Sequence, residues 1–103
     1  MEINGVNKVQ DAGRKLRLMI SGKVDTLTAP RLEEAILEKE DGITDLILDF
    51  SGVEYISSAG LRVLLLAQKR MVARGGGVVI KGAGKVVKEV FTITGFSDIL
   101  TME

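Results

Sequence analysis

The 103-residue sequence contains no cysteine and no histidine. Without cysteine the chain has no disulfide, no thiolate metal ligand and no cysteine nucleophile. Without histidine it lacks the commonest general base and the commonest transition-metal ligand, and a Ser-His-Asp triad is impossible. We therefore predict no catalytic residue, no metal site and no cofactor, and an enzyme is the least favoured class of function.

An excess of charge and a long apolar run are also missing. Lysine plus arginine equals aspartate plus glutamate at 14 each, so no net field attracts nucleic acid or anionic lipid. No stretch approaches the length of apolar sequence that a membrane helix needs, and the N-terminal MEINGVNKVQ lacks a basic-then-apolar signal pattern. We expect a cytoplasmic protein that binds neither nucleic acid nor membrane.

Aromatic residues make up only 4% of the chain, whereas apolar residues make up 46%. This balance predicts a core of leucine, isoleucine and valine, and the 27% of charged residues suits a soluble surface. A chain of this length builds one hydrophobic core but not two. We therefore treat residues 1–103 as a single domain.

The most informative stretch runs from Leu46 to Met71. It opens with an apolar strand, Leu46–Phe50, whose lack of alternation predicts burial on both faces. A short loop at Ser51–Glu54 follows. After Gly60 the leucines recur with the period of a helix, on a stripe predicted to continue to Val72. The stretch therefore reads as strand, loop and helix.

Hydrophobic periodicity and turn residues place the other elements along the chain. The expected strands are Glu2–Val9, Lys15–Ser21, Leu46–Phe50 and Val78–Lys81, with a final edge strand at Ile99–Leu100; the expected helices run from Thr28 to Asp41–Gly42, from about Ser58 to Arg74, and from Gly84 to a stop at Gly95. The order β-β-α-β-α-β-α(-β) predicts an α/β fold. We expect a mixed β-sheet of four to five strands, with the helices packed mainly on one side.

Two adjacent serines, Ser57 and Ser58, open the central helix. A serine at this position commonly caps the helix by accepting a hydrogen bond from the first turn, which contributes about 1 kcal/mol. One serine would suffice for that purpose. Gly60 in the first turn costs about 1 kcal/mol relative to alanine, which suggests that something approaches the backbone closely. Because a helix N-terminus also tolerates a phosphate, a serine here is a suitable phosphoacceptor.

The stretch LDFSGVEYISSAGLRVLL resembles the signature of the bacterial anti-sigma-factor antagonists, which are small STAS domains. The segments GKVDTLTAPRLEEAI and GGGVVIKGAGKVVKEVFTITGFSDIL extend the resemblance over nearly the whole chain. In that family the phosphorylated serine lies two residues before a Gly-Leu pair, which corresponds to Ser58. The family's usual aspartate before this serine is replaced here by Ser57, so the loop carries one negative charge fewer.

The resemblance implies a binding module controlled by phosphorylation of Ser58. The unmodified protein would bind an anti-sigma factor serine kinase and free a sigma factor, and a PP2C-type serine phosphatase would reset the switch. The resemblance also favours a partner-binding role for Asp25, which is otherwise an ordinary loop residue before a helix. The partner-binding residues implied are Asp25, Thr26, Glu54, Ser57, Ser58, Ala59, Gly60 and Arg62.

A second class of function stays open, because the aspartate before Ser58 is missing. The chain would then be a non-switching STAS subunit that binds a small molecule or supports a lipid-transport or membrane-transporter assembly.

Two nucleotide-binding motifs are incomplete in this sequence. Gly82-Ala83-Gly84 lacks the third glycine of a dinucleotide turn, and Gly84-Lys85 lacks the rest of a phosphate-binding loop. The cluster Lys81, Lys85 and Lys88 is interpreted as a solvated face.

Overall fold

The computed structural model describes residues 7–12, 14–39 and 42–103. Its elements are β1 (Asn7–Ala12), β2 (Lys15–Val24), α1 (Ala29–Lys39), β3 (Asp45–Ile56), α2 (Ser58–Ala73), β4 (Gly77–Lys81), α3 (Lys85–Thr94), a 3-10 helix η1 (Phe96–Asp98) and β5 (Thr101–Met102). This order confirms the predicted alternation of strands and helices, including the final short strand.

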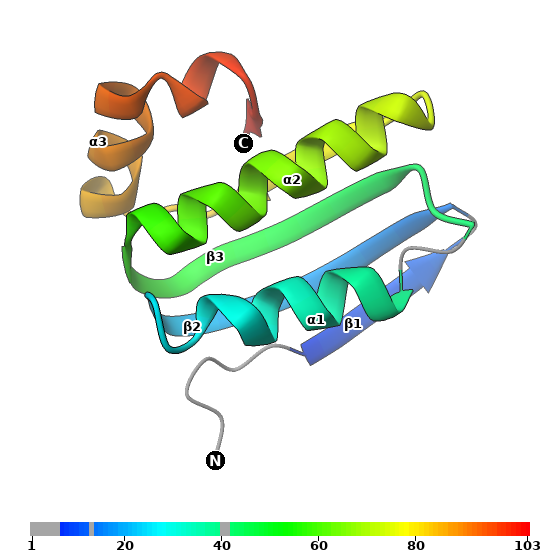
Figure 1. The fold of residues 1–103 in the computed structure, drawn as a ribbon, viewed down its shortest axis with the longest axis horizontal. Helices are drawn as coiled ribbons and strands as arrows, with labels where there is room; N and C mark the ends of the chain where they lie inside the picture. The colour runs from blue at the N-terminus through cyan, green and yellow to red at the C-terminus, as the bar shows by residue number, and fades with distance from the viewer. Residues whose placement is uncertain (1–6, 13, 40–41) are drawn as a thin grey trace.

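The five strands form one sheet in the order β1-β2-β3-β4-β5. β1 and β2 pair antiparallel, and the other neighbouring strands pair parallel, so the sheet is mixed as predicted. Figure 1 shows α1 and α2 side by side in front of the sheet, with α3 next to the start of α2. The α/β fold with helices mainly on one side is confirmed.

The core lies between the sheet and its helices. Every second side chain of a strand points to the same face of the sheet, so alternate strand residues fill this core. Buried side chains alternate along the strands: Leu16, Leu18 and Ile20 on β2, Leu46, Leu48 and Phe50 on β3, and Val78 and Ile80 on β4. The prediction that Leu46–Phe50 is buried on both faces is wrong, because Ile47 and Asp49 are only half-buried. The reason is that the helices cover one face of the sheet and leave the other open.

Several strand boundaries differ from the predicted ones. β2 continues to Val24 instead of leaving the sheet at Gly22, and β3 continues through the predicted loop Ser51–Glu54. The β2–β3 register shifts twice, between Met19 and Ser21 and between Gly22 and Lys23 of β2. These irregularities let a polar stretch of β3 stay paired although its pattern resembles a loop.

The outer ends of the chain also depart from prediction. β1 spans Asn7–Ala12 and so continues three residues beyond the predicted end at Val9, and residues 2–6 of the predicted first strand lie outside the described residues. β5 begins at Thr101, two residues later than predicted, because η1 takes up the residues after Gly95. Gly95 itself has a φ of 81° and ends α3 in the left-handed conformation, as predicted.

The two C-terminal helices bury narrower stripes than the sequence predicts. On α2, Leu61 and Leu64 are buried as expected, but Val72 is 54% exposed. On α3, Val87 and Phe91 are buried, whereas the apolar residues Val86 and Ile93 are exposed. Each helix contacts the core along one line, so an apolar residue one position off that line stays in solvent.

Gly60 has an internal reason to be glycine. It lies buried in the first turn of α2, where a Cβ atom would come within 2.7 Å of both Ile56 Cγ1 and Val24 Cγ1. Two buried, β-branched strand residues therefore lie against the helix backbone itself. The close approach suggested by the sequence exists, but the approaching groups belong to the core of this domain.

Replacing Gly60 with alanine tests this packing, because two effects of opposite sign compete. Helix propensity alone would stabilise Gly60→Ala by about 1 kcal/mol. Overpacking against Val24 and Ile56 costs about 1–3 kcal/mol and should prevail. We expect a net loss in the free energy of unfolding, measured by urea denaturation. A more stable Gly60→Ala variant would show that the core yields readily at this position.

Candidate functional site

The first turns of the helices gather at one edge of the sheet. β2, β3 and β4 are parallel, and a helix follows each of them, so α1, α2 and α3 all begin beyond the carboxyl ends of these strands. Figure 1 shows the starts of α1 and α2 close together at this edge. This is the edge at which parallel α/β sheets commonly place their binding residues.

Ser57 is the N-cap residue of α2 and anchors the helix to the neighbouring strand. Its N–H donates to the Val24 carbonyl at 2.8 Å, and its own carbonyl accepts from the Leu61 N–H at 3.0 Å. Its hydroxyl oxygen is buried and has no hydrogen-bond partner among the described residues. The predicted capping hydrogen bond from the serine side chain is therefore not formed by Ser57.

Ser58 is the first residue of α2 and is exposed. None of the hydrogen bonds found in the described part of the chain uses its hydroxyl. The two serines therefore differ sharply in accessibility: the oxygen of Ser57 is shielded from solvent, and the side chain of Ser58 points outward. Of this pair, only Ser58 is open to a modifying enzyme.

Asp25 organises the turn that joins β2 to α1. Its Oδ1 accepts from the Leu27 N–H at 3.0 Å and from the Thr28 N–H at 3.1 Å. The Thr28 hydroxyl accepts from the Asp25 N–H at 2.8 Å and donates to the Lys23 carbonyl at 2.7 Å. Thr28 directly precedes α1, but its hydroxyl closes the preceding turn instead of capping the helix. Asp25 is therefore a structural residue of the loop. It also lies beside the start of α2, where a partner-binding role would require it to be.

The hydrogen bonds around Asp25 keep it ionised. Partial burial acts to raise the pKa of the Asp25 carboxyl, but the N–H groups of Thr28 and Leu27 outweigh this effect and lower the pKa from its usual value. The Thr28 hydroxyl and the nearby Lys23 act in the same direction. The turn therefore presents a fixed negative charge near the serine pair.

A shallow groove between α1 and α2 brings several of the predicted residues together. Its volume is about 280 Å³, and it is lined by Thr26, Ala29, Pro30, Glu33, Ala59, Arg62, Val63 and Leu66. Its floor is apolar, and Thr26, Glu33 and Arg62 are its polar members. Thr26, Ala59 and Arg62 of the predicted partner-binding set thus share one surface beside Ser58.

Two of the predicted partner-binding residues, Gly60 and Glu54, do not line this groove. Gly60 is buried under Val24 and Ile56, so it shapes the site from within. Glu54 is exposed on β3, and no hydrogen bond or ion pair within the described ranges joins it to Asp25 or Ser58.

The sequence did not single out Leu27, which is 79% exposed on the Asp25 turn, or the exposed Tyr55 at the end of β3. An apolar residue next to a helix start has no periodic signal that separates an exposed position from a buried one.

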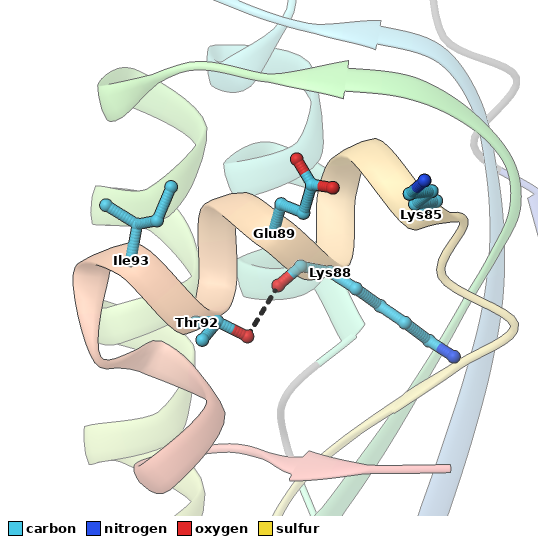
Figure 2. Close-up of a pocket in the computed structure, with 5 residues that line it drawn as sticks. All are labelled: Lys85, Lys88, Glu89, Thr92 and Ile93. Carbon is cyan, nitrogen blue, oxygen red and sulfur yellow. Dashed lines mark hydrogen bonds between the residues drawn. The ribbon is translucent and has the colours of Figure 1, made fainter.

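A larger hollow lies on the exposed side of α3, and neither Ser57 nor Ser58 lines it. Figure 2 shows its lining, Lys85, Lys88, Glu89, Thr92 and Ile93, all on this one helix. The side chains of Lys85 and Lys88 leave the helix in different directions, and Lys81 pairs with Glu103 at 3.5 Å. A single helix cannot enclose a ligand, and these lysines do not converge on a common point. The geometry agrees with a solvated face.

The chain is also related in sequence to a known protein family. A sequence model of the STAS domain family matches residues 6–103. The chain belongs to the STAS domain family. A relative from Listeria monocytogenes, named anti-sigma-B factor antagonist, is 33% identical to this STAS domain over 88 residues, which cover 84% of this chain and 76% of the relative.

Solved STAS structures share the fold of this chain. A structure of the anti-sigma factor antagonist SpoIIAA in its unphosphorylated form has a TM-score of 0.82 at 15% identity and covers 95% of this chain and 87% of its own. A Bacillus SpoIIAA in its phosphorylated form has a TM-score of 0.74 at 14% identity and covers 95% of this chain and 90% of its own.

Among the described residues, none of the helices combines the length and apolar character needed to cross a bilayer.

The lowered pKa of Asp25 predicts an acid-sensitive STAS domain. A carboxyl whose pKa is lower in the folded than in the unfolded chain stabilises the fold above its unfolded pKa, and this contribution is lost as the pH falls through the folded value. Asp49, whose pKa is lowered by hydrogen bonds from Ser51, contributes in the same sense. We expect the free energy of unfolding to fall as the pH drops from about 5 towards 2.

The variant Asp25→Asn isolates the part of this acid-dependent loss of stability that is due to Asp25. Asparagine keeps an acceptor oxygen for the turn but cannot titrate. Urea unfolding at a series of pH values should show a smaller loss of stability in Asp25→Asn than in the wild type over the same acidic range. Equal losses in the two proteins would contradict the assignment.

Proposed function

We propose that this STAS domain is an anti-sigma factor antagonist that works by partner switching. In the unmodified state it binds an anti-sigma factor serine kinase, and the sigma factor held by that kinase is released. The name of the Listeria monocytogenes relative supports this class of function. The structural observation that carries the proposal is the exposed Ser58 at the first position of α2, beside a shielded Ser57.

Phosphorylation of Ser58 is chemically straightforward in this setting. The Ser58 oxygen attacks the γ-phosphorus of ATP, the bond to ADP breaks, and the hydroxyl proton passes to a base of the kinase. The new phosphate lies at the N-terminus of α2, where unpaired N–H groups and the helix dipole favour an anion. The modification therefore has no need to unfold the helix.

The added charge is expected to end the complex. A phosphoserine carries about −1.5 to −2 charges near neutral pH. The proposed interface already contains the ionised Asp25 and the exposed Glu54. Burying an unpaired charge in an interface that fits a neutral hydroxyl costs several kcal/mol, which changes affinity by orders of magnitude. Removal of the phosphate by a PP2C-type serine phosphatase restores binding.

In this scheme the chain is the substrate of a kinase and a phosphatase, not an enzyme itself. Because the kinase uses ATP and controls a sigma factor, we assign the switch to the cytoplasm. The partner-binding surface comprises the Asp25 turn, the start of α2 and the groove that contains Thr26, Ala59 and Arg62.

Intact mass after incubation with ATP and the cognate kinase tests which serine is modified. The wild type should gain one phosphate. Ser57→Ala, the matched control, should still gain it because its lost oxygen is buried, whereas Ser58→Ala should gain none. A phosphate on Ser57, or none on the wild-type protein, would contradict the proposal, and the second result would favour the non-switching alternative.

Pull-down with the same kinase tests the consequence for binding. Ser58→Ala should stay bound in the presence of ATP because it cannot be released by phosphorylation. Ser58→Asp should bind weakly from the start, because its carboxylate places a charge where the hydroxyl was. The control is wild-type protein without ATP, which should bind as Ser58→Ala does. Equal affinities of Ser58→Ala and Ser58→Asp would refute an electrostatic switch.

A further inference from the structure

Arg62 lies one helical turn after Ser58. Residues at i and i+4 of a helix are neighbours, with Cβ atoms about 6 Å apart, and helical side chains lean towards the N-terminus. The Arg62 side chain is therefore long enough and suitably placed to reach back to the position of Ser58. Both residues are exposed and lie in the same continuous helix, α2.

Among the residues that the structure describes, none holds the Arg62 guanidinium in an ion pair or hydrogen bond. Glu33 is the acidic residue that shares its groove, yet no ion pair within 4.0 Å joins the two, and no hydrogen bond in the described part of the chain involves the Arg62 side chain. The guanidinium is therefore available to a new anion. Arginine is also the residue best suited to bind phosphate, because its planar fork can donate two hydrogen bonds at once.

We infer that Arg62 binds the phosphate of phosphorylated Ser58 within the same helix. This inference rests on the proposed modification of Ser58 and adds a residue that receives the new charge. The order of the pair is the favourable one, with the anion N-terminal to the cation.

The pair gives Arg62 two states. In the unmodified protein Arg62 lines the groove between α1 and α2, together with Thr26 and Ala59. In the phosphorylated protein the guanidinium turns back towards Ser58. Phosphorylation then changes the proposed interface twice, because it adds an anion and also withdraws a cation from the groove.

The test uses protein in which phosphoserine is incorporated at position 58 during translation, so that no kinase is needed. Its result is therefore independent of whether the cognate kinase modifies Ser58, which the intact-mass experiment decides separately. The phosphate is titrated by ³¹P NMR. A nearby guanidinium favours the dianion and lowers the second phosphate pKa, whereas Asp25 and Glu54 raise it equally in all variants.

Three variants complete the design. Arg62→Gln should raise the phosphate pKa by roughly 0.15 to 0.4 unit relative to the wild type. Arg62→Lys should keep most of the wild-type value because it keeps the charge. Lys69→Gln removes an exposed cation that lies about three turns beyond Ser58 on the same side of α2, and it should leave the phosphate pKa unchanged.

Equal phosphate pKa values in the wild type and Arg62→Gln would overturn the inference. So would an equal shift in Lys69→Gln, because that result would report the net charge of the domain and not a local pair.

Discussion

The site depends on one seam, where the end of β2 meets the start of α2. The Ser57 N–H donates to the Val24 carbonyl at 2.8 Å, and Gly60 lets the side chains of Val24 and Ile56 lie directly against the helix backbone. Together these contacts fix the first turn of α2 relative to β2. The Asp25 turn, which follows Val24 directly, is thereby held beside Ser58, although the two lie far apart in the sequence.

The same seam decides which serine faces solvent. Ser57 is the N-cap residue and has an extended backbone, whereas Ser58 is the first residue of the helix and is exposed. Ser57 is bound to β2 through its backbone, and its hydroxyl oxygen lies buried with no hydrogen-bond partner in the part of the chain that the structure describes. A neutral hydroxyl tolerates this position at lower cost than an ionised carboxylate would. The serine that replaces the family's usual aspartate therefore suits the local packing of this chain.

The sequence predicted the order of elements and the mixed sheet because hydrophobic periodicity and turn residues mark most of the strands and helices. It failed where tertiary packing overrides local pattern. Ser51–Glu54 resembles a loop, yet the irregular register with β2 keeps it in the sheet. Gly60 looked like a site for an outside group, because no local pattern shows that Val24 packs on it. The exposure of Leu27 likewise depends on a turn whose hydrogen bonds join residues that no periodicity connects.

A switch of this kind can act without a change of fold. Ser58 lies at the surface, so a phosphate there displaces no core side chain and breaks no hydrogen bond of the described structure. What changes is the surface electrostatic field, because an anion appears between the ionised Asp25 turn and Arg62, the basic residue that lines the adjacent groove. The balance between repulsion from Asp25 and attraction to Arg62 then sets how strongly the phosphate opposes a partner. A small rigid domain can in this way use one exposed oxygen to control binding, while its core stays the same in both states.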